Sequence, residues 1–549
     1  MHFETIIVIL FAVAATVALL ARWLRVPYTV ALVVAGLALG AAHAFEPPHL
    51  TKELLYAVFL PGLLFEAAFH LDFAKFRQNK LTIVSLAVPG VIAAITLTGG
   101  LLTPIVDALH FVEGFTLGHG LVFGALIAAT DPIAVVGLFK SLGAPKRLAV
   151  MVEGESLLND GTAVVLFTLI LGAVSGTSGA GVPAAVLEFV RVVGMGLVIG
   201  LAFGFVASKV IQLVDEPMIE ITVTTIAAYG SFVAAEQFHF SGVIATVTAG
   251  MICGNYAAVT GMSPSTRIAV ESFWEYLAFA LNSVVFLLIG FSVSLEMLIA
   301  SALPIVIAFS IVMLARAVVV GTASGFLRLT REKTPWSWTA VMVWGGLRGG
   351  LSMVLALGLS PEFPHRELLI TMTYGVVVLS ILVQGLSMTP LLRLLGLVGE
   401  KEERQRYEIE RGELRAVKSA LAALDRMEKE GGVQPPTAAA LREEYHARQT
   451  HAEAAIRALH LAASELEEED RIAARRHLLQ QEKRAVLADT QKGLLSPGAA
   501  EHLQREIDAR LFRLDAGEDA FVVEPPPSAS PAQPAATATP AAPAPAASQ

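Results

Sequence analysis

Two short stretches decide how this chain folds: Ala-Thr-Asp-Pro at residues 129–132 and Glu-Ser-Leu-Leu-Asn-Asp at residues 155–160. Each lies in the middle of a long apolar segment. An ionised group at mid-depth of a bilayer costs about 3 kcal/mol or more, so an acid there is by default a functional hypothesis. Pro132 also breaks a helix, because it has no N–H to donate and its ring crowds the carbonyl four residues back. The pattern suggests a pathway for a cation and a proton.

The apolar segments fill only the first part of the chain. Of the 549 residues 55% are hydrophobic and 16% are charged, and the mean hydropathy is +0.64. Residues 1–400 hold 42 of the 87 charged residues, and the last 149 residues hold the other 45. The first part is therefore membrane-like and the second resembles a soluble region. The single cysteine, Cys253, excludes an internal disulfide and a cysteine-built metal site, and the net charge of −9 gives no reason to expect nucleic acid as a partner.

Thirteen apolar runs are long enough to cross about 30 Å of hydrocarbon. They lie near residues 4–23, 27–46, 52–70, 81–107, 119–139, 147–174, 184–213, 219–237, 241–258, 269–293, 299–327, 336–360 and 368–397. The first run leads straight into further hydrophobic segments, so it is interpreted as a transmembrane helix and not as a removable signal. The sequence thus predicts an all-α polytopic membrane protein that spans the lipid bilayer.

Basic residues indicate the orientation. With the N-terminus outside, fourteen lysines and arginines fall on the inner side, and only Lys52 and Arg366 lie in outer loops. This bias matches the positive-inside rule. We therefore expect a multi-pass protein of the plasma (inner) membrane, with its N-terminus outside and its charged tail in the cytoplasm.

Three regions follow from this division: a transmembrane domain at 1–397, a helical tail at 398–523 and a disordered C-terminus at 524–549. Within the tail, helical spacing of Ala, Leu, Glu and Arg predicts helices at 402–431, 437–462, 464–492 and 497–514. The last region contains Pro, Ala, Ser and Thr without periodicity. The tail shows no catalytic constellation, and its sequence does not identify a partner.

Asp131 and Asp160 are predicted to lie at one depth. Counted from opposite sides of the membrane, Asp131 lies about 18 Å into the fifth span and Asp160 about 20 Å into the sixth. Ser156, Asn159 and Asp160 stand at i, i+3 and i+4 and so share one helix face. Their hydroxyl, amide and carboxylate oxygens suit Na⁺ or Li⁺. A buried carboxylate is neutralised by either a proton or a cation, and that choice is the minimal requirement for exchange.

The helix break at Pro132 supplies further oxygens. Because the backbone opens there, carbonyls near Thr130 and Asp131 become free, and such backbone is tolerated at this depth only beside protein or water. Many secondary transporters use broken helices at the midplane in this way. Glu66, toward the inner end of the third span, is expected either to line a cytoplasmic funnel as an oxygen ligand or simply to reach water.

Other charges on the sixth span need partners. Glu155 is about 140° around the helix from Asp160, so it faces a different neighbour. A buried carboxylate requires a counter-charge, and the candidates are Arg316 and Arg348. We pair Glu155 with Arg316 as a structural or gating ion pair. Arg348 and Glu153 are possible supporting residues, and the glycines around Arg348 suggest a second interrupted helix.

Together these stretches resemble a known family. Residues 129–167 look like the NhaP/NHE-type sodium/proton antiporters of the monovalent cation:proton antiporter superfamily, with further similarity at 228–231, 281–290 and 345–349. The resemblance spans most of residues 10–397. It implies thirteen helices in an inverted-repeat fold, in which a dimerisation domain faces a mobile core with interrupted, crossing fifth and twelfth helices. It also implies a homodimer that works by elevator-like alternating access.

Carried over residue by residue, the resemblance implies a Na⁺ site made by Asp160, Asp131, Ser156, the Thr130 carbonyl and Glu66. Asn159 matches the asparagine that marks the electroneutral branch, where the electrogenic branch has a second aspartate. Glu155 and Arg316 match a stabilising ion pair.

The predicted function is therefore secondary active transport and not enzyme catalysis: exchange of one Na⁺ or Li⁺ for one H⁺, without a cofactor, for pH and sodium homeostasis. The nearest alternative is K⁺/H⁺ exchange, because a looser site would bind a larger ion. An intramembrane aspartyl protease would place an Asp in a Gly-x-Gly-Asp context, which neither Asp has here. A cation channel or sensor would need a continuous polar pore, whereas these groups cluster at one depth. A primary pump would carry a Gly-x-x-x-x-Gly-Lys-Ser/Thr phosphate loop, which is missing from this sequence.

Overall fold

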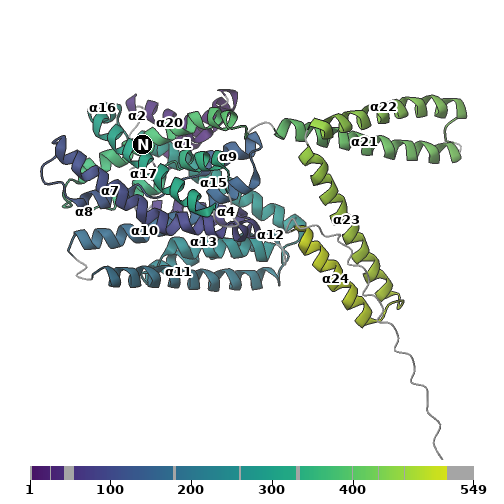
Figure 1. Ribbon diagram of the computed structural model, residues 1–549, viewed down its shortest axis with the longest axis horizontal. Coiled ribbons are helices and arrows are strands. Elements are labelled where there is room, and N and C mark those ends of the chain that lie inside the picture. Colours follow the sequence, from purple (N-terminus) through teal and green to yellow (C-terminus); the bar gives the residue numbers. More distant parts are fainter. Residues whose placement is uncertain are drawn as a thin grey trace, which may run out of the picture. The chain divides into compact units, whose positions relative to one another are not determined.

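The computed structural model describes residues 3–24, 26–42, 55–176, 181–258, 261–328, 334–397, 400–430, 432–462 and 464–515. Within these ranges the regular elements are helices and no strand occurs, which confirms the all-α prediction (Figure 1). The chain divides into two compact units, Met1–Lys401 and Glu402–Gln549. The predicted disordered region 524–549 lies outside the described residues.

The helices of the first unit follow the apolar runs in order. They are α1 (Phe3–Leu24), α2 (Tyr28–Ala41), η1 (Leu55–Phe59), α4 (Leu60–His70), α5 (Phe73–Gln78), α6 (Lys80–Ser85), η2 (Leu86–Gly90), α7 (Val91–Ala108), α8 (Leu117–Leu126), α9 (Ile133–Leu142), α10 (Lys146–Val174), α11 (Val182–Ile211), α12 (Pro217–Gln237), α13 (Gly242–Ile252), η3 (Cys253–Ala257), α15 (Pro264–Phe291), α16 (Leu295–Ala300), α17 (Ala302–Leu327), α18 (Trp336–Trp344), α19 (Gly350–Leu357) and α20 (Arg366–Leu394). In the part of the chain that the structure describes, seven helical stretches are long and apolar enough to cross a membrane, and others are shorter. The count of thirteen crossings therefore stays a prediction.

Both predicted interruptions are present, and they meet. The fifth predicted span divides into α8 and α9 at Pro132, and the twelfth divides into α18 and α19 at the glycines around Arg348. At the meeting point the Asp131 N–H donates to the Leu347 carbonyl over 2.7 Å. This bond satisfies backbone groups that the two breaks free inside the membrane domain, where water cannot.

Helix α15 is held by an unusually close approach to α2. A Cβ atom added at Gly36 would lie 2.2 Å from the Leu287 carbonyl oxygen, and one at Gly290 would lie 2.2 Å from the Val33 carbonyl oxygen. Real Cβ atoms do not come so close, so glycine is required on both helices. The contact fixes the helix that carries Asn282.

The second unit is built from α21 (Glu400–Lys429), α22 (Pro435–Ala462), α23 (Ser464–Gln491) and α24 (Pro497–Asp515), close to the predicted ranges. Figure 1 shows α21 beside α22 and α23 beside α24. The first pair is bridged by Arg442, whose Nη2 donates to Asp425 over 2.9 Å and to Glu428 over 2.6 Å. The second pair is linked by Lys483, which donates to Asp508, and a small apolar cluster around Leu479 is buried between the two helices.

Candidate ion-binding site

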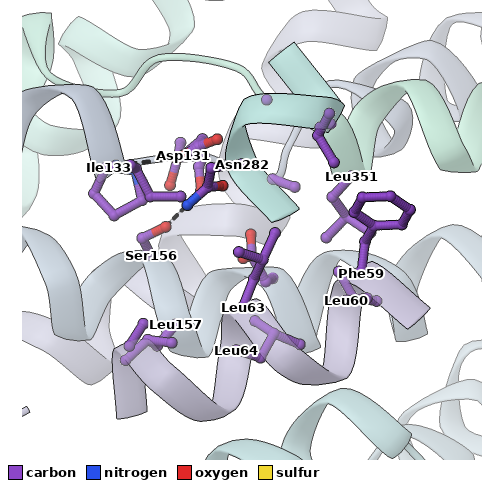
Figure 2. A pocket seen from close by; sticks show the side chains of 18 of the residues that line it. Phe59, Leu60, Leu63, Leu64, Asp131, Ile133, Ser156, Leu157, Asn282 and Leu351 are labelled. Carbon is purple, nitrogen blue, oxygen red and sulfur yellow. Dashed lines mark hydrogen bonds between the residues drawn. The ribbon is translucent and has the colours of Figure 1, made fainter. Parts of the chain in front are cut away.

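A pocket lies where the two interrupted helices meet, and both mid-depth acids line it. Asp131 belongs to the break between α8 and α9, whereas Ser156 and Asp160 belong to α10, and Thr130 lies beside them. Figure 2 shows Asp131, Ser156 and Asn282 from three different elements around the pocket. Apolar side chains of α4 and α19 complete it: Leu60, Leu63, Leu64 and Leu351. The structure thus combines the two acids into one site.

The polar face of α10 is bonded to the broken backbone. The Ser156 hydroxyl donates to the Thr130 carbonyl. Asn159 Nδ2 donates to the Ala128 carbonyl over 3.1 Å and to Thr130 Oγ1 over 3.0 Å. Asn159 does not line the pocket. Its amide holds the segment 128–130 at the helix break, and its place among the ion-binding residues stays a prediction.

The two carboxylates have different surroundings. Asp131 Oδ1 accepts the Ile133 N–H over 3.0 Å, and a Cβ at Gly349 would lie 2.5 Å from the Asp131 side chain, so this carboxylate is held in place. Asp160 Oδ1 is buried and accepts no hydrogen bond from any residue that the structure describes. A buried carboxylate oxygen without a donor is strongly destabilised when ionised, so a proton or a cation stabilises it.

Glu155 and Arg316 form a buried two-pronged ion pair. Arg316 Nη1 and Nη2 donate to the two Glu155 oxygens over 2.7 and 2.8 Å, and both side chains are at most 10% exposed. Arg316 Nη2 also donates to the Met342 carbonyl over 3.0 Å. The pair therefore joins α10, α17 and α18 behind the pocket, with the geometry that makes Arg–carboxylate contacts strong.

Arg348 braces the helix breaks. Its guanidinium, on a side chain only 5% exposed, donates through Nη1 to the Ala128 carbonyl over 2.8 Å and to the Ala129 carbonyl over 3.3 Å. Its backbone N–H donates to Ser380 Oγ of α20 over 3.1 Å. The sequence left the role of Arg348 open, and these contacts place it as the donor to carbonyls that the break in the other helix exposes.

Glu66 is not brought to the pocket. One of its carboxylate oxygens lies 3.2 Å from His70 Nδ1 on the same helix, and α4 contributes apolar side chains to the pocket instead. The sequence left open whether Glu66 is an oxygen ligand or simply reaches water. In this conformation its carboxylate does not line the pocket. The position of a residue along a helix determines its depth in the membrane. The direction of a flexible carboxylate also depends on neighbouring side chains, here His70.

Two further residues line the pocket: Glu153, which the sequence offered as a supporting residue, and Asn282, which it did not assign. Glu153 lines it, three residues before Ser156 and seven before Asp160, positions that share one face of α10. Asn282 also lines it, and its Oδ1 is buried without a hydrogen-bond partner in the described ranges. An amide in the middle of the apolar segment 269–293 was the signal that could have identified Asn282.

Known proteins are similar to this chain in sequence and in fold. The family described as "Sodium/hydrogen exchanger, transmembrane" matches residues 8–394. The Na⁺/H⁺ antiporter ApNhaP of Aphanothece halophytica is 38% identical over 400 residues, which cover 72% of this chain and 74% of the relative. The Na⁺/H⁺ antiporter NhaG of Bacillus atrophaeus is 33% identical over 516 residues, 91% of this chain and 96% of the relative, so its similarity extends into the tail. The solved structure of the sodium proton antiporter MjNhaP1 from Methanocaldococcus jannaschii shares the fold, with a TM-score of 0.59 and 21% identity over 71% of this chain and 98% of that one.

Proposed function

The chain belongs to the sodium/hydrogen exchanger family, and from that premise we propose that it exchanges one Na⁺ or Li⁺ for one H⁺. The observation that carries the proposal is the buried Asp160 Oδ1, which has no donor within the described residues and shares a pocket with Asp131. One carboxylate does not hold a proton and a cation at the same time, so each displaces the other. Alternating access then converts this competition into exchange.

The donor set fits an alkali cation. Carboxylate oxygens of Asp160 and Asp131, the Ser156 hydroxyl and the Thr130 carbonyl surround the pocket, and the Asn282 carbonyl oxygen adds a fifth candidate. All are hard oxygen donors. Glu66 would join this set only by leaving His70, and Glu153 adds negative charge that attracts cations to the pocket.

The proposal includes the setting. The protein acts in the plasma membrane as a homodimer, with its N-terminus outside and its tail in the cytoplasm, and it serves pH and sodium homeostasis. Fourteen basic residues on the inner side support this orientation. The relatives reported above are Na⁺/H⁺ antiporters by name, so the similarity gives no support to K⁺/H⁺ exchange.

We expect the exchange to be electroneutral. An amide at Asn159 adds no titratable charge beside Asp160, so one proton leaves for each cation that binds. In proteoliposomes with an imposed pH gradient, Na⁺ and Li⁺ should dissipate the gradient and K⁺ should not, and an inside-negative potential should leave the initial rate unchanged. Acceleration by the potential would contradict the 1:1 stoichiometry, and an equal response to K⁺ would contradict the choice of ion.

A further inference from the structure

A groove runs between α17, α18 and α20 on the outside of the first unit. It is lined by Ala317, Gly321, Trp336, Thr339, Ala340, Val343, Trp344 and Leu391. A Cβ added at Gly321, or at Gly325 one turn further along α17, would meet nothing within 4 Å. From Ala317 to Gly325 this open side of α17 extends for about 12 Å. In a chain that spans a membrane, an apolar groove on the outside faces lipid.

One end of the groove carries a positive charge. Arg328 follows Gly325 by three residues and so lies on the same side of α17. Its guanidinium lies over the ring of Trp336, 3.9 Å from the centroid, and Trp336 itself lines the groove and is 63% exposed. A guanidinium beside an aromatic ring keeps N–H groups with which it can donate to a further acceptor. That arrangement suits a phosphate oxygen.

A second pair of the same kind shows the depth of this end. Arg147, at the start of α10, lies over Trp338 with 5.5 Å between its guanidinium carbon and the ring centroid. Trp is enriched at membrane–water interfaces, and basic residues lie just beyond the membrane ends of the helices. The N-terminal end of α18 therefore lies at the level of the lipid headgroups, and the groove leads from there into the hydrocarbon.

We propose that this groove binds one anionic phospholipid, with its phosphate at Arg328 and one acyl chain along Ala317 and Gly321. The lipid would join the two helices behind the exchange site. Arg316, the residue before Ala317, donates to the Met342 carbonyl of α18 over 3.0 Å, and an acyl chain in the groove adds dispersion contacts across the same junction. This binding does not depend on which ions are exchanged.

The test uses the purified full chain in detergent, titrated with dioleoylphosphatidylglycerol or dioleoylphosphatidylcholine. Native mass spectrometry measures bound lipid, and thermal unfolding measures stabilisation. We expect phosphatidylglycerol to bind more tightly and to raise the melting temperature more. Arg328→Gln should weaken phosphatidylglycerol binding about tenfold, the loss of one charge-assisted hydrogen bond, and should remove the preference between the lipids. Gly321→Leu and Ala317→Leu, which fill the groove, should weaken binding of both lipids.

Matched controls come from α11. Arg191 also lies over an aromatic ring, that of Phe240 at 5.8 Å, and a Cβ at Gly194 would meet nothing within 4 Å. Arg191→Gln and Gly194→Leu should leave lipid binding unchanged. The proposal is overturned if the wild type binds both lipids equally, if Arg328→Gln keeps the preference, or if neither groove variant weakens binding. It is also overturned if the α11 variants weaken binding as much as the groove variants do.

Discussion

Asp160→Ala should abolish sodium-driven proton movement, with a loss of about a hundredfold or more. The reason is electrostatic: the cation loses one of the two aspartate carboxylates in its pocket, and a charge at mid-depth that lacks its counter-charge costs about 3 kcal/mol or more, which corresponds to about two powers of ten in occupancy. The Oδ1 atom of Asp160 is buried and accepts no hydrogen bond from the described residues, so a proton or a cation is what stabilises it. The measurement is the initial rate of pH-gradient dissipation in proteoliposomes after addition of Na⁺.

The isosteric Asp160→Asn should be equally inactive. Near neutral pH an amide does not bind a proton, and it carries no negative charge that would neutralise a bound cation. Asp107→Ala, at an exposed acid near the end of α7, should exchange like the wild type. If Asp160→Ala exchanges Na⁺ for H⁺ at the wild-type rate, the ion site lies elsewhere and the assignment of Asp160 is contradicted.

Arg316→Ala should destabilise the protein by about 3–5 kcal/mol, because it leaves Glu155 buried without its counter-charge. It also removes the hydrogen bond that links α17 to the Met342 carbonyl of α18. Folding yield and the thermal unfolding midpoint should fall more than the apparent affinity for Na⁺. The double variant Glu155→Gln/Arg316→Met should recover part of the stability, since no unpaired charge remains.

The opposite order would contradict the structural role of the pair. If Arg316→Ala unfolds like the wild type but needs much more Na⁺ for half-maximal exchange, Arg316 acts on the ion directly. Arg191→Ala provides the control for loss of an exposed arginine on another helix.

Hydropathy and two local breaks predicted much of this fold from sequence. Pro132 marks one interruption, because proline has no backbone N–H to donate to the helix. The glycines around Arg348 mark the other, because glycine makes the helical backbone less rigid. The pairing of Glu155 with Arg316 followed from angle on the helix and from the rule that a buried charge needs a partner. The contact between the two interruptions depends on residues 131 and 347, which are far apart in sequence, so local patterns do not contain it.

The site was less predictable, because side-chain direction depends on neighbours. Asn159 shares a helix face with Asp160, yet its amide donates to the Ala128 carbonyl and to Thr130 Oγ1. Glu66 lies at a plausible depth, but its carboxylate lies 3.2 Å from His70 Nδ1 one turn away and does not line the pocket. Asn282 is marked only as an amide within an apolar segment, and its place at the pocket depends on the glycine contacts that position α15 against α2.

Competition between a proton and Na⁺ for Asp160 is measured most directly by the Na⁺ dependence of the initial exchange rate at a series of pH values. If both bind the same carboxylate, the apparent KM for Na⁺ rises as the pH falls, approaching about tenfold per pH unit, while the maximal rate is unchanged. A constant KM with a maximal rate that falls at low pH would show that protons act at a different site, and would contradict exchange at Asp160.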